Sequence, residues 1–254
     1  RDVMEFRRVL FRSDPWTLPP EEEANFTEKV WRLPETRLCF TPPDVNVPVS
    51  PLPALTRGQV TFASFSNAAK VNDAVIATWA VILKRVAGSR LLLKAKQFEE
   101  PLVREGMTTQ FRNAGIDSAR LIFEGRSPRR DSLAAYSRTD IVLDPFPFPG
   151  GTTTAESLWM GVPVLTLAGQ RFVSRQGVGL LTNAGLPDWV AQDESDYIGR
   201  AIQHASDLQG LAELRGRLRA QVLASPVFDA PRMARNLEAA FRGMWAQWCT
   251  TRDA

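Results

Sequence analysis

The sequence predicts an α/β fold in which a doubly wound, parallel sheet is covered by helices on both faces. From residue 59 onward, short apolar runs alternate with longer amphipathic segments, which is the pattern of successive strand–helix units. The runs IVLD (141–144) and VPVLTL (162–167) are almost continuously apolar, as expected of strands buried on both faces. Glycine-rich or polar stretches follow several strands, where sheets of this kind bind their ligands.

The first 57 residues are expected to lie outside this sheet. Positions 5–13, EFRRVLFRS, look like the conceptual translation of a common sequencing adapter, so we expect residues 1–13 to be an artefact and the gene to continue upstream. These residues hold four arginines and two acids, which is most of the net charge of +3. The basic balance therefore does not indicate a nucleic-acid partner.

Residues 14–57 are rich in proline, which predicts a connector of loops and turns. Within it, TRLCF (36–40) is expected to form a short strand, and residues 42–53 a linker.

Residues 58–254 are expected to form one domain with additional C-terminal helices. Asp73 is a plausible cap for a first helix that ends in basic residues, and Gly115 and Gly161 are expected to close later helices. Strands are predicted over 59–65, 90–96, 119–125, 140–146, 162–169 and 188–191. Helices are predicted over 73–86, 101–115, 129–138, 152–161, 171–185, 194–207, 208–225 and 234–248.

The composition argues against several classes of protein. His204 is the one histidine, and no nucleophile motif lies beside it, so Ser-His-Asp and Cys-His catalysis are disfavoured. Cys39 and Cys249 lie at opposite ends of the chain, which disfavours a disulfide framework and suits a reducing, cytoplasmic compartment. There is no metal-ligand spacing, and no apolar run approaches the roughly 20 residues that span a bilayer. We therefore expect no metal and no membrane partner.

The stretch DPFPFPGGTTT, between a strand and a helix, has the composition of an anion site. Gly150 and Gly151 allow a ligand to approach the backbone, and Thr152, Thr153 and Thr154 place amides and hydroxyls at the helix start. Free amides and the helix dipole together favour a phosphate there. An ordinary threonine-capped helix fits these residues equally well. The stretch lacks the lysine of a P-loop and the G-x-G-x-x-G pattern of dinucleotide-binding proteins.

Other candidates follow neighbouring strands. Glu156, inside the same helix, either complements the helix dipole or accepts the hydroxyls of a ribose. Lys70 and Asn67 lie on the loop after the first strand, where a lysine can neutralise a diphosphate, although many loop lysines are merely solvated.

A further loop, EGRSPRR, combines a glycine with three cations. Gly125 leaves room for a base edge to meet main-chain groups, while Arg126, Arg129 and Arg130 either face an anion or begin a solvated helix. Arg175 is another candidate to face an anion.

Together these residues resemble the catalytic C-terminal region of the protein O-linked N-acetylglucosamine transferase family, which has Spindly-like and bacterial members, often preceded by tetratricopeptide repeats. The resemblance is carried by FSNAAK with WAVILKRV, and by DIVLDPFPFPGGTTTAESLWMGVPVLTLAGQRFVSR, and it covers residues 14–248. It implies the Rossmann-like C-terminal half of a GT-B glycosyltransferase. Residues 58–254 would bind the nucleotide-sugar donor, and residues 14–57 would be a remnant of the N-terminal half.

The resemblance also implies an activity. The expected reaction is an inverting, metal-independent transfer of GlcNAc from UDP-GlcNAc to Ser or Thr of a protein acceptor. The expected partners are the UDP-sugar, a protein acceptor and the N-terminal half in cis, which would supply the catalytic base. This chain alone is expected to be inactive. A glycan or lipid acceptor, or a catalytically silent interaction module, are the alternatives.

The resemblance assigns roles to individual residues. Lys70 would contact the donor diphosphate and Asn67 would lie near the nucleotide, while Thr152 and Thr153 would bind the phosphates and Glu156 the ribose.

The sequence also departs from the family pattern. Gly151 and Ser132 stand where many members have histidine, and Ala135 stands where an arginine is usual. These departures leave the sugar and the base contacts open.

Overall fold

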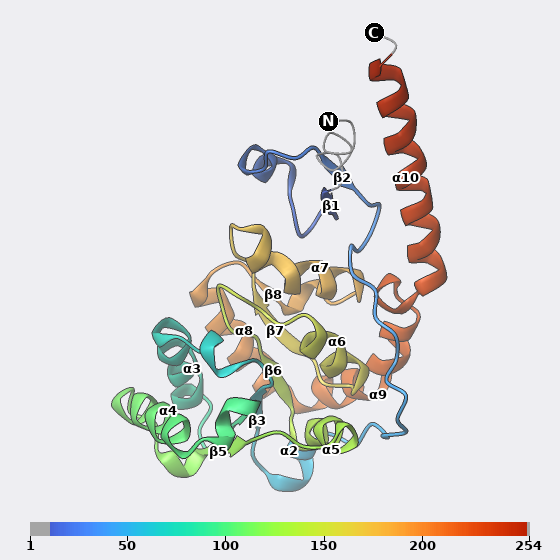
Figure 1. Cartoon of the computed structure of the whole chain (residues 1–254). Helices are drawn as coiled ribbons and strands as arrows, with labels where there is room; N and C mark the ends of the chain where they lie inside the picture. Colours follow the sequence, from blue (N-terminus) through green and yellow to red (C-terminus); the bar gives the residue numbers. More distant parts are fainter. Residues whose placement is uncertain (1–10, 253–254) are drawn as a thin grey trace.

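The computed structural model describes residues 11–252, and its centre is a six-stranded parallel sheet (Figure 1). Its strands are β3 (Thr61–Ser64), β4 (Arg90–Lys94), β5 (Leu121–Glu124), β6 (Ile141–Leu143), β7 (Val164–Leu167) and β8 (Val190–Ala191). They lie in the order β5-β4-β3-β6-β7-β8, and every pair is parallel. The chain runs outward from β3 to β5, returns to β6 beside β3, and then runs outward the other way. The doubly wound parallel sheet predicted from the sequence is confirmed.

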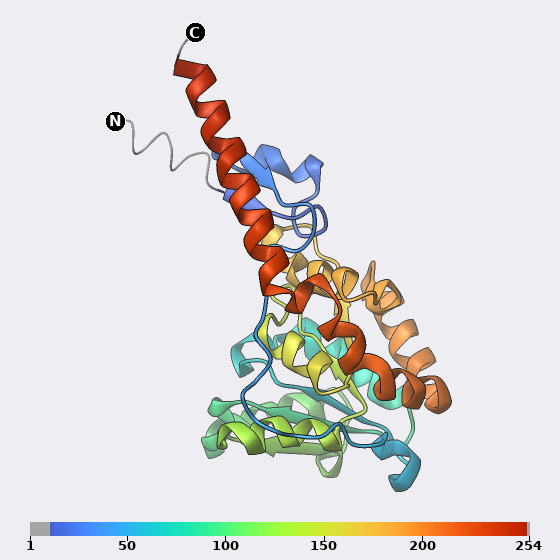
Figure 2. The same ribbon diagram turned by 90° about the vertical axis from the view of Figure 1, so that its right-hand side faces the viewer.

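The helices pack around this sheet in connected groups. Helix α3 packs against α4 and α8, while α6 packs against α7 and α9 (Figures 1 and 2). Their bounds are α2 (Pro53–Arg57), α3 (Asp73–Arg85), α4 (Pro101–Asn113), α5 (Arg129–Ala134), α6 (Thr152–Trp159), α7 (Gln176–Asn183), α8 (Glu194–Ser206), α9 (Leu208–Leu223) and α10 (Ala230–Arg252). Within residues 11–252, no helix has both the length and the apolar character needed to cross a bilayer.

Helix α3 shows how the sequence pattern produces these elements. Its N-cap is Asn72, whose side chain accepts a hydrogen bond from the Val75 amide at 3.0 Å, so the predicted cap Asp73 was wrong by one residue. An asparagine oxygen accepts a hydrogen bond from a free helix amide as well as an aspartate oxygen does. Asn72, which has extended backbone, is the residue in the cap position. The face of the helix that enters the core carries Val75, Ile76, Trp79, Ala80, Ile82 and Leu83.

Glycines end two of the helices, as predicted. Gly115 and Gly161 follow α4 and α6 with φ angles of 80° and 76°, in the left-handed region that glycine adopts without strain. At Gly161 a side chain would also meet the Val49 methyl at 2.7 Å, so the connector packs closely against this turn.

The N-terminal segment differs from the prediction. TRLCF is not a strand; instead β2 (Val30–Arg32) pairs in parallel with β1 (Phe11–Ser13). A single apolar run has no strand partner specified by its own residues, because pairing depends on distant backbone. β1 belongs to the stretch expected to be an artefact, and residues 1–10 of that stretch lie outside the described residues. The artefact assignment stays a prediction.

The last helix leaves the sheet domain and runs beside the N-terminal segment (Figures 1 and 2). Leu33 packs with Ala240 and Met244 of α10 in a small apolar cluster, apart from the main core. The connector and the C-terminal helix therefore pack against each other in a part of the protein that lies apart from the sheet.

Candidate functional site

A buried carboxylate forms a hydrogen bond with the backbone of the loop after β6. Asp144 follows β6 and accepts a hydrogen bond from the Gly150 amide at 2.7 Å. From α7, the amide group of Gln176 donates to the carbonyl of Gly150 at 3.3 Å. Both polar groups of one glycine are thus engaged by side chains, which fixes the backbone just before α6 begins.

Lys70 lies in the short 3₁₀ turn after the neighbouring strand β3, and it reaches the same loop. Its ammonium donates to the carbonyl of Pro149 at 3.0 Å and lies 3.8 Å from the centre of the Phe148 ring. Burial lowers the pKa of Lys70, and the charge of Asp144 partly offsets that effect. The sequence-based expectation that Lys70 and the glycine–threonine loop share one edge of the sheet is therefore confirmed in space. Since one bond occupies only one of three ammonium protons, the cation is still able to bind an anion.

Helix α6 begins without a side-chain cap. Gly151 occupies the N-cap position, and none of the threonines caps the helix, so the alternative of a threonine-capped helix is not what the structure shows. Thr152 is exposed, Thr153 is half-buried and Thr154 is buried. An uncapped helix start leaves its first amides for solvent or for a ligand, and its dipole favours an anion.

The buried carboxylate of Asp144 titrates abnormally. It is 2% exposed, and burial raises its pKa from the usual 3.8 to about 6. The Gly150 amide, the Thr166 and Thr154 hydroxyls and the charge of Lys70 oppose this shift without cancelling it. The folded protein therefore binds this proton more tightly than the unfolded chain does.

This shift predicts a pH-dependent difference between the wild type and Asp144→Asn. Because the folded-state pKa is raised, the stability linked to Asp144 is present below about pH 4 and is lost as the pH rises through about 6. Relative to Asp144→Asn, which does not titrate there, the wild type should lose about 3 kcal/mol of unfolding free energy across this window. Urea denaturation at several pH values from 4 to 7.5 measures the difference. A difference that is constant with pH would contradict the buried ionisation.

A cleft of about 230 Å³ lies beside the first turn of α6. It is lined by Gly125 and Arg126 from the loop after β5, and by Thr153 and Glu156 from α6. With Arg129, which also lines the cleft, five of the residues predicted from sequence are thus brought together at one place. Helix α6 joins this cleft to the loop contacted by Lys70, so both parts form one site.

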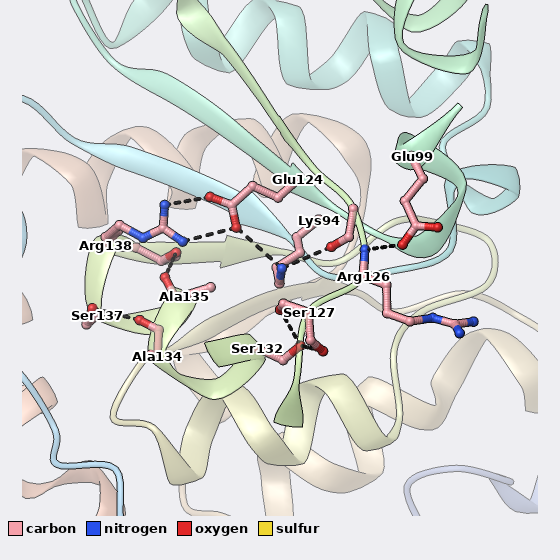
Figure 3. Close-up of polar contacts among 12 residues, drawn as sticks. Lys94, Glu99, Glu124, Arg126, Ser127, Ser132, Ala134, Ala135, Ser137 and Arg138 are labelled. Carbon is pink, nitrogen blue, oxygen red and sulfur yellow. Dashed lines mark hydrogen bonds and ion pairs between the residues drawn. The ribbon is translucent and has the colours of Figure 1, made fainter. Parts of the chain in front are cut away.

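The cleft carries more positive than negative charge. Lys94, Lys96, Arg126 and Arg129 line it, and Glu156 is the one acid that does so among the described residues. Figure 3 shows Lys94 and Arg126 in this region. Lys94, which the sequence analysis did not select, donates to the carbonyl of Gly125 at 3.0 Å. A charged residue directly after the apolar run LLL, at the carboxyl end of the strand RLLLK, is the signal that identifies it.

The backbone of the β5 loop is held by a second side chain. Glu99 accepts a hydrogen bond from the amide of Arg126 at 2.8 Å (Figure 3). A side chain at Gly125 would lie 2.5 Å from the Glu99 methylene, so glycine lets these two segments approach. The guanidinium of Arg126 itself is exposed.

Two stacked aromatic rings line the same cleft. Phe65, just after β3, stacks on Tyr136 with ring centres 3.9 Å apart and an angle of 25° between the planes. The Tyr136 hydroxyl donates to the carbonyl of Thr153 at 3.3 Å, and burial raises the pKa of that hydroxyl. These rings come from segments 71 residues apart, which is why sequence patterns did not pair them.

Glu156 forms an ion pair inside the site. Its Oε1 accepts a hydrogen bond from the Arg129 guanidinium at 2.6 Å, with 17% of the acid side chain and 51% of the arginine side chain exposed. The arginine is thus the more exposed member of the pair, and Oε1 is the carboxylate oxygen that it engages.

Three further candidates lie elsewhere. Asn67 is exposed and caps the short 3₁₀ turn that ends at Lys70, accepting from the Ala69 amide at 2.9 Å. Arg130 is exposed and does not line the cleft. The expectation for Arg175 does not fit its geometry, because its guanidinium is directed to the backbone carbonyls of Trp16 and Gly169 at 2.9 and 3.1 Å.

Comparison with known sequences identifies relatives over most of the chain. The family profile of glycosyl transferase family 41 matches residues 45–237. A protein of Arabidopsis thaliana described as a probable UDP-N-acetylglucosamine–peptide N-acetylglucosaminyltransferase, SPINDLY, is 41% identical over 237 residues, which is 91% of this chain and 25% of that protein. The barley (Hordeum vulgare) protein of the same name is 42% identical over 231 residues, 91% of this chain and 24% of its own length. The chain therefore spans about a quarter of the length of these curated relatives.

Solved structures share the architecture. A mutant O-GlcNAc transferase of Thermobaculum terrenum superposes with a TM-score of 0.88 at 32% identity, covering 96% of this chain and 47% of that one. A sucrose-phosphate synthase of Thermosynechococcus elongatus superposes with a TM-score of 0.58 at 17% identity, which shows the fold alone. The predicted fold, half of a GT-B enzyme with additional C-terminal helices, is confirmed.

Proposed function

The chain belongs to glycosyltransferase family 41, and on that premise we propose that it is the donor-binding half of an inverting protein O-glycosyltransferase. The observation that carries this proposal is the joining of Lys70 and the uncapped start of α6 to the cleft that holds Glu156. A cation and free helix amides suit a diphosphate, and a neighbouring acid suits a ribose. A nucleoside diphosphate sugar satisfies all three groups at once.

In the proposed reaction, an acceptor hydroxyl attacks the anomeric carbon of the sugar from the face opposite the diphosphate. The bond between that carbon and the diphosphate oxygen breaks, and the diphosphate leaves with the electron pair. Lys70 and the first amides of α6 stabilise the charge that develops on it, so the proposal includes no metal. The hydroxyl proton passes to a base that we place outside these residues. We expect the chain alone to bind donor without transferring sugar.

The names of the relatives indicate which substrates to test first. They are described as using UDP-GlcNAc and peptides, so we propose UDP-GlcNAc as donor, Ser or Thr of cytoplasmic proteins as acceptor, and neither nucleic acid nor membrane as partner. Two residues replace those usual in the family: Ser132, which lines the cleft, and Ala135, which is buried. The sugar and base are therefore tested with a panel of donors.

Calorimetric titration of UDP into the chain tests the proposal. We expect Lys70→Ala to weaken UDP binding about 10- to 100-fold and Glu156→Ala about tenfold, because each variant lacks a charged side chain that would form hydrogen bonds with the ligand. Arg85→Ala, which removes an exposed cation at the far end of α3, should leave the affinity unchanged. A folded wild-type chain that binds no nucleoside diphosphate would contradict the proposal.

A further inference from the structure

Lys94 is a largely buried cation that lines the cleft. It is the last residue of β4, it lies opposite Glu124 in the register with β5, and 8% of it is exposed. Its ammonium donates to the carbonyl of Gly125 at 3.0 Å and lies 3.4 Å from a Glu124 oxygen (Figure 3). Both partners come from the adjacent strand end, so the position of the ammonium is well defined.

The carboxylate beside Lys94 is already paired with another cation. Arg138 donates to the two oxygens of Glu124 at 2.5 and 3.0 Å (Figure 3). Burial alone would raise the pKa of Glu124, but the hydrogen bonds and charges of Arg138 and Lys94 outweigh it and lower that pKa. One carboxylate thus faces two cations, and a positive charge is left over at this end of the cleft.

One proton of the Lys94 ammonium lacks an acceptor. An ammonium has three donors and no acceptor, and Gly125 and Glu124 account for two of them. Within residues 11–252 there is no third acceptor, and the side chain lines the cleft. A largely buried cation that is not fully hydrogen-bonded is costly, so an acceptor supplied by a ligand would stabilise it.

The position of Lys94 relative to Glu156 indicates which part of a nucleotide it would meet. Lys94 and Glu156 line the same cleft, Lys94 from the end of β4 and Glu156 from helix α6. The proposed diphosphate position is at Lys70 and the start of α6, so a ribose at Glu156 leaves the base to occupy the cleft that Lys94 lines.

Resting on the proposed function, we propose that Lys94 determines which nucleobase the donor carries, by donating a hydrogen bond to a keto oxygen at the far edge of that base. Uracil and guanine present an oxygen at that edge, whereas cytosine and adenine present an amino group. An ammonium cannot accept a hydrogen bond, so an amino group of the base at that position would place one hydrogen-bond donor against another and form no bond. The predicted donors are therefore keto-base nucleoside diphosphate sugars.

The test compares two matched pairs of ligands on the whole chain: UDP with CDP, and GDP with ADP. Within the pair that contains the keto-base ligand preferred by the wild type (UDP or GDP), we expect this ligand to bind at least about tenfold more tightly than its amino-base counterpart (CDP or ADP). About tenfold is the value of one hydrogen bond to a charged group. In Lys94→Met this ratio should fall to about 2 or less, through a loss of keto-base binding. Lys96→Met is the matched control: Lys96 is exposed on the same cleft, and its removal should weaken all four ligands alike.

The outcomes separate the two proposals. A wild type that binds none of the four ligands contradicts the proposed function, and the role of Lys94 with it. Binding without base preference, or a Lys94→Met variant that weakens all four ligands equally, leaves the proposed function standing and shows that Lys94 is only structural. If Lys94→Met does not fold, Lys94→Gln serves instead. Its amide both donates and accepts, so it should bind keto and amino bases alike, and a preserved keto preference would overturn the inference.

Discussion

Replacing Arg215 by methionine is expected to lower the free energy of unfolding by about 3–5 kcal/mol, the effect of breaking a buried charged network. The side chain is 1% exposed. It donates to the carbonyls of Ser50, Thr139 and Tyr136 at 2.7, 2.8 and 3.0 Å. Methionine fills similar space but removes all three hydrogen bonds. The Tyr136 carbonyl keeps its bond from the Thr139 amide at 3.2 Å, whereas the carbonyls of Thr139 and Ser50 lose the Arg215 donor, which costs free energy.

Arg215 also connects parts of the chain that are far apart in sequence. From α9 it reaches the connector at Ser50 and the segment between α5 and β6. Burial lowers its pKa to about 10, with the charge of Asp140 opposing the shift, so the guanidinium is charged at neutral pH. Its removal should therefore loosen the connector as well as α9.

Denaturant titration of Arg215→Met and Arg217→Met measures this effect. Arg217 lies on the exposed side of the same helix, so its replacement should change the unfolding free energy by less than about 1 kcal/mol. Equal midpoints for the two variants would show that the buried network does not hold the connector.

The second large effect is expected at Gly150. A β-carbon there would lie 2.6 Å from the hydroxyls of both Thr153 and Thr154, and 3.0 Å from the carboxylate of Asp144. Gly150→Ala must therefore displace the loop or the first turn of α6, where we propose that the diphosphate binds. Displacing these groups removes hydrogen bonds to the charged diphosphate, so we expect the affinity for UDP to fall about tenfold or more.

Calorimetry with UDP measures the loss, and thermal denaturation shows whether the variant is folded. Gly199→Ala in α8 is the control, because a β-carbon there has no neighbour within 4 Å. It should leave binding unchanged and stabilise the helix by up to about 1 kcal/mol. UDP affinity in Gly150→Ala equal to that of the wild type would show that the start of α6 does not contact the diphosphate.

Patterns that are local in sequence predicted much of the fold. Alternating apolar runs and amphipathic segments predicted all six strands of the sheet, because the pattern of apolar residues along a short segment depends on whether one or two of its faces are buried. The same locality explains the errors. TRLCF has strand composition but no partner, and Asn72 rather than Asp73 caps α3, since adjacent cap residues differ little in preference.

The candidate site shows a similar division. Lys70 and the glycine–threonine loop were selected because each follows a strand, and parallel strands place their carboxyl ends at one edge of the sheet. The stacking of Phe65 on Tyr136 and the pairing of Arg129 with Glu156 were not predicted. Residues far apart in the chain form these contacts, and no local pattern specifies which of them meet.

For this protein, then, the amino-acid sequence was sufficient for the class of fold, the loop that we propose for the diphosphate, and the family. Strand periodicity, glycine and proline positions and helix-start residues act over a few neighbouring residues. Only the folded chain shows that Lys94 ends beside Glu124 with one proton unpaired, that Asp144 is buried, and that Arg215 holds the connector. Burial and hydrogen-bond satisfaction depend on every element packed around a group, so they are properties of the tertiary structure.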